Sequence, residues 1–321
     1  MKRFAIMFSA LMLMCCFASL SASAADFTQL EYEVTENDEI IITACDAGVR
    51  GAVEIPAEIN GKPVSIIGSS AFTGCEDIEE IILPETIEKI EPYAFYGCSS
   101  LKKVNLPSTP DIYGVGLFTG CSALEYVTLP DDLEEISDNM FYGCSALRRV
   151  SIPGGVKSIG DNAFYGCENL RAIVLPTELD EISRNAFQNC SQLFFVRMPK
   201  NITYIGENAF SGCKALRIIS LPEDISQIST GCFYGCEALS HIRIPLSVLE
   251  IKADAFAECP ALANIEFEHD SSDMLIIAEE AFMLSTMLDT TIVCPDGEKP
   301  NGALKEYVWE YSGRFVEYKS K

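Results

Sequence analysis

Histidine and tryptophan are scarce in this chain, and the usual signatures of an active site are missing. Two histidines and one tryptophan occur among 321 residues. Neither His241 nor His269 has a nucleophile-base pattern nearby, and no P-loop, dinucleotide-binding glycine motif, H-E-x-x-H or G-x-S-x-G is present. We therefore predict a non-catalytic protein that uses no cofactor and no metal ion.

Basic residues are also few, because 23 Lys and Arg stand against 47 Asp and Glu, for a net charge of −24. Such a surface repels nucleic acid and anionic membranes, so we expect no nucleic-acid partner. Hydrophobic residues make up 48% of the chain, which excludes a disordered protein and supplies a large core.

Long apolar runs are missing after the first residues of the chain. Lys2 and Arg3 precede an apolar stretch over residues 4–20, and small residues follow it. This order predicts a secretory signal peptide over residues 1–25, cleaved near Ala24 or Ala25. An adjacent pair of cysteines in the stretch leaves lipidation as an alternative. No later segment is long enough for a transmembrane helix, so we expect a secreted or cell-surface protein.

Phenylalanine recurs every 23 residues without slippage, and each copy is followed three positions later by cysteine. The phenylalanines are Phe72, Phe95, Phe118, Phe141, Phe164, Phe187, Phe210, Phe233 and Phe256. A strict period of this length predicts one supersecondary unit copied and stacked as a solenoid. Solenoids usually present a binding surface, and stacked coils lie roughly 4.8 Å apart when their strands are hydrogen-bonded.

Within each copy, a β-branched residue stands six positions after the cysteine, an apolar residue eight positions after it, and proline nine positions after it in eight of nine copies. This alternation predicts a short strand that the proline ends. A second extended piece around the next isoleucine follows. The Asp or Asn before Ala-Phe and the Gly after it predict one short helical turn.

The unit L-x-x-V-x-L-P-x-x-L-x-x-I-G-x-x-A-F-x-G-C, as in Leu147 to Cys167, resembles the BspA-like class of leucine-rich repeat over roughly Val53 to Val293. The resemblance implies an α/β repeat solenoid: a right-handed coil with one main parallel sheet and short helical turns. It also implies a bacterial secreted or cell-surface protein, similar in some members to adhesins that bind host matrix. The pattern is interrupted at Ser108–Gly116 and by an insertion at His269–Asp273.

The two ends of the repeat array are predicted to be caps, because terminal coils must be covered. Residues 26–52 read as an N-terminal cap with a hairpin around Glu36-Asn37-Asp38. The solenoid occupies 53–293. Residues 294–321 form a C-terminal cap whose helix is expected over Asn301–Ser312, and a partner-binding helix is the alternative.

The nine repeat cysteines could be disulfides, metal ligands or core residues. Stacking in register points them all the same way at about 5 Å, whereas a disulfide needs Cβ atoms near 3.8 Å. One cysteine per coil also gives no four-ligand metal cluster. We predict a buried column of free thiols. The asparagine row at Asn139, Asn162, Asn185 and Asn208 is predicted to bond between coils rather than to bind a cation or glycan.

The outward strand positions carry eight basic residues, far above a proportional share, with aromatic residues among them. This composition is typical of interface hot spots, although solubilising surface residues would explain it equally well. The predicted ligand is a protein or a glycan bound through this face, and the basic residues favour an anionic one. A self-associating structural component without a specific ligand is the alternative, and the oligomeric state is left open. The candidate ligand-binding residues are Lys102, Lys103, Tyr126, Arg148, Arg149, Arg171, Phe194, Phe195, Arg197, Arg217, His241 and Arg243.

Overall fold

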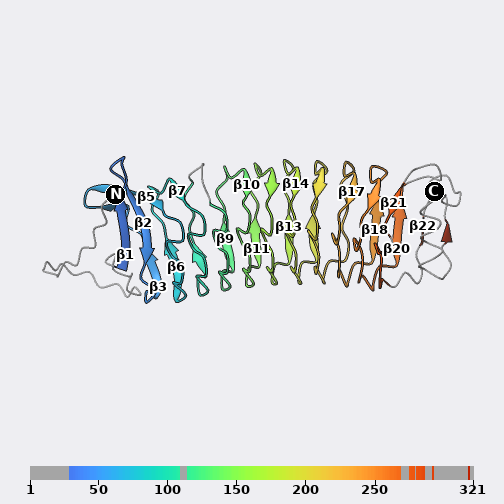
Figure 1. Cartoon of the computed structure of the whole chain (residues 1–321), viewed down its shortest axis with the longest axis horizontal. Coiled ribbons are helices and arrows are strands. Elements are labelled where there is room, and N and C mark those ends of the chain that lie inside the picture. The colour runs from blue at the N-terminus through green and yellow to red at the C-terminus, as the bar shows by residue number, and fades with distance from the viewer. Residues whose placement is uncertain are drawn as a thin grey trace.

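The computed structural model describes residues 29–108, 114–268, 275–278 and 280–285, with two further short strands at 291–292 and 317–318. Short strands stack one behind another into an elongated rod, with the first hairpin at one end (Figure 1). Most coils contribute one strand to each of two parallel rows. The described part of the chain is therefore a β-solenoid.

Most strands of the first row come from the segments that end at the repeat proline. Its strands are β3 (Gly51–Glu54), β6 (Ile78–Ile82), β8 (Lys103–Val104), β9 (Tyr126–Thr128), β11 (Arg149–Ser151), β13 (Ala172–Val174), β15 (Phe195–Arg197), β18 (His241–Ile244), β20 (Asn264–Phe267), β22 (Thr291–Ile292) and β23 (Glu317–Tyr318). Pairing is parallel and in register, so that Ile173 lies beside Val196 and Ile242 beside Ile265. The predicted β-branched position is thus a buried column.

A second strand row corrects the expectation of one main sheet. It contains β5 (Lys62–Ile67), β7 (Lys89–Ile90), β10 (Glu135–Ile136), β12 (Ser158–Ile159), β14 (Glu181–Ile182), β16 (Tyr204–Ile205), β17 (Gln227–Ile228), β19 (Glu250–Ile251) and β21 (Ile276–Ile277). These pieces also pair in parallel, as Ile159 does with Ile182. The repeat isoleucine is buried while the residue before it faces outward, so two residues suffice for a ladder.

The predicted short helical turns are wrong: no helix occurs among the residues that the structure describes. Asn139 and Gly143 both have left-handed backbone angles, with φ of 56° and 72°, and only three residues separate them. Backbone N–H groups alternate between two kinds of acceptor. Those of Asn139, Phe141 and Gly143 donate to carbonyls of the next coil, whereas those of Met140 and Tyr142 donate to carbonyls of their own coil. This alternation resembles a strand ladder, and the left-handed residues stop any helical turn from continuing.

The phenylalanines form a continuous stack inside the rod, as predicted. All nine are fully buried. Ring centroids of neighbours lie 5.2–5.7 Å apart, and from Phe95 onward the rings are within 15° of parallel. Burial of this many rings against one another supplies a large share of the apolar stabilisation.

The cysteines form a parallel column of free, buried thiols, which also confirms the prediction. From Cys98 to Cys259, each thiol donates to the carbonyl of the phenylalanine in the preceding coil, at 3.1–3.3 Å. Ser285 replaces cysteine in the following coil, and its hydroxyl donates to the Phe256 carbonyl at 2.6 Å. A small hydrogen-bond donor therefore occupies this position in both forms.

The N-terminal hairpin is present as predicted. β1 (Leu30–Val34) pairs antiparallel with β2 (Ile40–Cys45), and β2 pairs in parallel with β5, so the hairpin extends the second strand row. A second, tighter hairpin follows, in which β4 (Glu58–Ile59) pairs antiparallel with β5 around Asn60 and Gly61. The predicted signal peptide and the C-terminal helix lie outside the described residues, as do the centres of the two interruptions of the repeat.

Candidate functional site

Eight basic residues were predicted to bind the ligand, and four of them form ion pairs with acidic side chains of the rod itself. The ion pairs are Lys102–Glu79 at 2.8 Å, Lys103–Glu80 at 2.6 Å, Arg148–Glu125 at 3.6 Å and Arg243–Glu223 at 3.0 Å, and Arg243 also bonds Glu268. These cations are neutralised locally. An external anion would have to compete with an internal carboxylate for each of them.

The other four basic residues, Arg149, Arg171, Arg197 and Arg217, are exposed and make no ion pair with the described part of the chain. The sequence explains this difference. In the four coils that begin at Cys144, Cys167, Cys190 and Cys213, the outward strand positions contain no Asp or Glu. Four guanidinium groups are therefore available on an otherwise strongly acidic protein.

Apolar side chains stand among these arginines and are unusually exposed. Val174 is 53% exposed, Phe194 52%, Phe195 47% and Ile218 59%. They project outward because the neighbouring strand positions are occupied by the buried column of Ile173, Val196 and Ile219. We call the four free arginines together with these four apolar residues the Arg–Phe patch. Exposed apolar residues beside unpaired cations are a combination expected of an interaction site.

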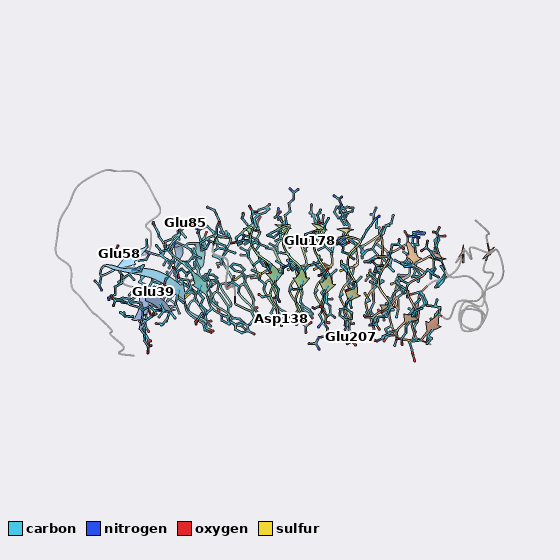
Figure 2. The ribbon with its side chains drawn as sticks, turned by 90° about the horizontal axis from the view of Figure 1, so that it is seen from above. Glu39, Glu58, Glu85, Asp138, Glu178 and Glu207 are labelled. Atoms are coloured by element: carbon cyan, nitrogen blue, oxygen red, sulfur yellow. The ribbon has the colours of Figure 1, made fainter. Side chains whose placement is uncertain are left out.

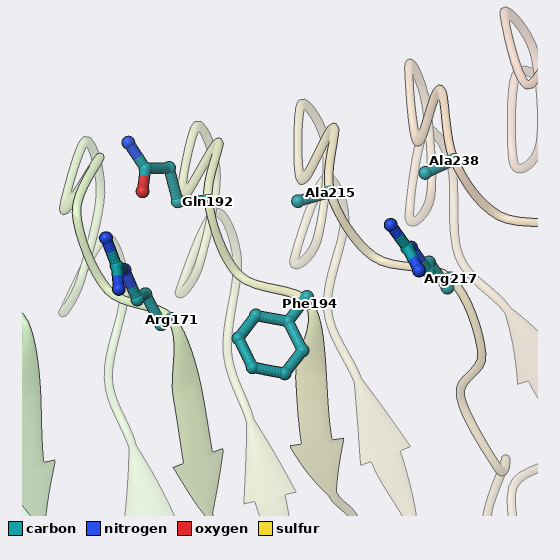
Figure 3. Close-up of a pocket in the computed structure, with 6 residues that line it drawn as sticks. All are labelled: Arg171, Gln192, Phe194, Ala215, Arg217 and Ala238. Atoms are coloured by element: carbon teal, nitrogen blue, oxygen red, sulfur yellow. The ribbon is translucent and has the colours of Figure 1, made fainter.

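A groove of about 470 Å³ lies along one side of the patch. Arg171 and Arg217 stand on either side of Phe194, and Gln192, Ala215 and Ala238 line the turn beside them (Figure 3). Successive coils supply Arg, Phe and Arg at the same position, four residues after the cysteine. The two alanines, two residues after it, are short enough to leave a hollow.

Acidic side chains lie along both sides of the rod. In Figure 2, Glu85 and Glu178 lie along one edge, and Asp138 and Glu207 lie along the other. On the second strand row, burial and the neighbouring Asp138 and Glu181 raise the pKa of the Glu135 carboxyl. The electrostatic field of the chain is thus negative at its edges, and the free arginines form a local exception.

Sequence reasoning located this region in part. Arg149, Arg171, Phe194, Phe195, Arg197 and Arg217 come together, and Tyr126, 53% exposed, lies in register with Arg149. His241 is half-buried, and its backbone pairs with that of Ile218 in an isolated parallel β-bridge. The groove residues Gln192, Ala215 and Ala238 were missed. The sequence feature that could have found them is a small residue two positions after the cysteine. Alanine recurs there, at Ala123, Ala146, Ala215, Ala238 and Ala261.

We next consider metal-ion binding and the reactivity of the thiols from Cys98 to Cys259 in the part of the chain that the structure describes. No cluster of three or more His, Cys, Asp or Glu side chains there is arranged to hold a metal ion. Burial raises the pKa of Cys98 and of Cys259 to about 12, so these thiols stay protonated at neutral pH. Nor does any helix in the described ranges have the length and apolarity needed to cross a bilayer.

Comparison with known proteins agrees with the repeat geometry. The chain is similar to a Treponema pallidum leucine-rich repeat protein, with 30% identity over 60% of this chain and 91% of that one and a TM-score of 0.55. It is also similar in fold to a leucine-rich repeat protein from Bacteroides ovatus, with 22% identity, coverage of 91% and 98%, and a TM-score of 0.61. No curated protein matches the chain.

The sequence matches the BspA-type leucine-rich repeat region, with 6 copies, over residues 65–194 and 180–299. Proteins built on this repeat typically mediate interactions, are generally non-enzymatic, and are typically found at the bacterial surface or secreted. Both the matched range and the stacked 23-residue coils lead to one assignment. This chain belongs to the BspA-type leucine-rich repeat family.

Proposed function

We propose that the protein is a secreted or cell-surface binding scaffold that holds an acidic segment of a partner protein on the Arg–Phe patch. The observation that carries the proposal is the separation of the basic residues into neutralised and free sets. The free arginines occupy four adjacent coils together with the exposed apolar side chains. The secreted location is supported by the signal-peptide pattern of residues 1–25 and by the typical location of proteins of this family.

The chemistry of the patch favours a polypeptide over a glycan. Guanidinium groups bind carboxylates with two parallel hydrogen bonds, and the Arg171–Phe194–Arg217 row offers two such groups around one aromatic ring. The exposed surfaces of Val174, Phe195 and Ile218 gain free energy only when apolar groups cover them. A segment with both carboxylate and apolar side chains satisfies both demands. A sulfated glycan would pair with the arginines and leave the aliphatic surface largely uncovered.

A phage-displayed random peptide library, selected on the chain without residues 1–25, tests this proposal. We expect enriched peptides to combine Asp or Glu with aromatic or aliphatic residues, and their binding to weaken as salt rises. The double variant R171Q/R217Q should weaken binding at least tenfold, because it removes two charge-assisted contacts of more than about 1 kcal/mol each. Replacing the exposed ring in F194A should also weaken binding.

The matched control is R148Q/R243Q, which removes two cations from the same face that are already paired with acids. It should leave peptide affinity within about twofold. No enrichment above an uncoated support, or equal loss in both double variants, would refute the assignment of the patch. Binding to a sulfated oligosaccharide array in place of peptides would assign the ligand to the glycan class. Concentration-dependent self-association abolished by R171Q/R217Q would identify a second copy as the partner.

A further inference from the structure

The first thiol of the cysteine column departs from the rule that the others follow. Cys98 donates to the Phe72 carbonyl at 3.3 Å, and the later thiols do the same with the phenylalanine of their preceding coil. Cys75 is preceded by the N-terminal hairpin, where no phenylalanine is available. Its sulfur lies 3.7 Å from the Cys45 carbonyl oxygen and 3.8 Å from that of Asp46. Cys75 thus has weaker hydrogen bonds than the rest of the column.

Cys45 occupies the place that phenylalanine takes in every regular coil. Its N–H donates to the Ala71 carbonyl at 2.8 Å, which repeats the bond from Phe72 to the Ala94 carbonyl, also 2.8 Å. Its carbonyl faces the thiol of the next coil, as the phenylalanine carbonyls do. The chain therefore places a second thiol at a position where the repeat would place a ring.

The two thiols share one acceptor. The Cys45 sulfur lies 3.7 Å from the Asp46 carbonyl oxygen, the same atom that the Cys75 sulfur approaches. They also interact with each other: the hydrogen bond from Cys45 lowers the pKa of Cys75, and the same contact raises that of Cys45. At Cys144 and Cys190, by contrast, burial is the main influence and raises the pKa of the thiol.

We propose that Cys45 and Cys75 form a disulfide that fastens the N-terminal hairpin to the first coil. Cys45 is half-buried, so an oxidant can reach it, whereas Cys75 is fully buried. The oxidant is itself a disulfide, either of a thiol–disulfide oxidoreductase or of a small molecule such as oxidised glutathione. The inference is independent of the Arg–Phe patch.

The exchange balances in two steps. The accessible Cys45 sulfur attacks one sulfur of the oxidant's disulfide as its proton passes to solvent, and the other sulfur leaves as a thiolate. The Cys75 thiolate then attacks the Cys45 sulfur of the mixed disulfide and displaces the second sulfur of the oxidant. Two protons and two electrons pass to the oxidant, which becomes two thiols. The remaining column thiols are buried and point the same way at the coil spacing, so they stay reduced.

The test incubates the chain without residues 1–25 with oxidised glutathione, alkylates free thiols in denaturant, and maps the peptides by mass spectrometry. We expect most molecules to carry one linked pair of peptides containing Cys45 and Cys75, with the other described cysteines alkylated. C45S should abolish the link. C75S provides a second test that retains a donor at this position, as Ser285 does naturally. C232A is the matched control, because Cys232 is a buried cysteine where most repeats carry alanine.

Limited proteolysis supplies a second readout. The oxidised chain should resist cleavage within its hairpin at least several-fold longer than the reduced chain or C45S, because fraying of the terminal coil is blocked. Complete alkylation of both cysteines, under conditions where a dithiol control peptide is fully oxidised, would overturn the proposal. A link between any other two cysteines would overturn it as well.

Discussion

The fold makes a sharp prediction about two phenylalanines, Phe187 and Phe194, that lie seven residues apart on either side of Cys190. Phe187 is fully buried, with ring centroids 5.2 Å from Phe164 and 5.3 Å from Phe210, whereas Phe194 is 52% exposed. Truncating a buried phenylalanine to alanine costs about 3–5 kcal/mol, and loss of two stacked neighbours places Phe187→Ala near the upper end. Phe194→Ala removes the same atoms from a half-solvated position and should cost less than about 1 kcal/mol.

Urea unfolding followed by circular dichroism measures the difference. With a denaturant slope of about 3 kcal/mol/M, the unfolding midpoint of Phe187→Ala should fall by about 1.5 M, and that of Phe194→Ala by less than about 0.3 M. Peptide binding should show the opposite order, since only Phe194 reaches the surface. Equal midpoint shifts for the two variants would refute the stacked interior, because both variants remove the same side-chain atoms and only the burial of the ring differs.

Three further predictions concern the asparagine row, an acidic cluster and the thiol column. Asn162→Ala should destabilise the fold by about 1–2 kcal/mol relative to Asn162→Gly in urea unfolding, because φ is 55° and both variants lose the same bond from Asn185; equal stability would contradict a backbone role. The raised pKa of Glu135 means that the folded chain holds this proton more tightly than the unfolded chain, so stability rises as pH falls through the folded pKa. Glu135→Gln should therefore raise the thermal midpoint at neutral pH and have no effect well below pH 4.5; a lower midpoint at neutral pH would count against this reasoning. Finally, an aromatic disulfide reagent at about pH 8 should leave Cys98 to Cys259 unmodified until urea is added, and fast labelling of the native chain would contradict their burial.

Sequence alone predicted the parts of the fold that depend on period. The phenylalanine and cysteine columns, the β-branched strand positions and the proline ends follow from a 23-residue spacing held without slippage, and each is found where it was expected. The prediction of helical turns was wrong for a local reason. Asn and Gly serve both as helix caps and as left-handed residues, and composition does not distinguish the two uses. The hydrogen bonds of Asn139, Phe141 and Gly143 to the next coil decide between them.

The candidate site was predictable in position but not in extent. Counting basic residues on outward strand positions treats Arg148 and Arg149 alike, although one is paired with Glu125 and the other is free. Which arginine remains unpaired depends on the residue one coil away, and therefore on the register of stacking. The alanines of the groove were missed because a small residue creates a hollow only beside larger neighbours such as Phe194.

Backbone bonding restricted to adjacent coils has an evolutionary consequence. Because Phe164 bonds to Ala186 as Phe187 bonds to Ala209, removing a whole unit leaves a junction that is chemically the same as the ones it replaces. An insertion between strands is also tolerated, because Phe282 stacks on Phe256 at 5.2 Å although 26 residues separate them. Rod length can therefore change through duplication or loss of complete units without altering the bonds that hold any one coil to the next.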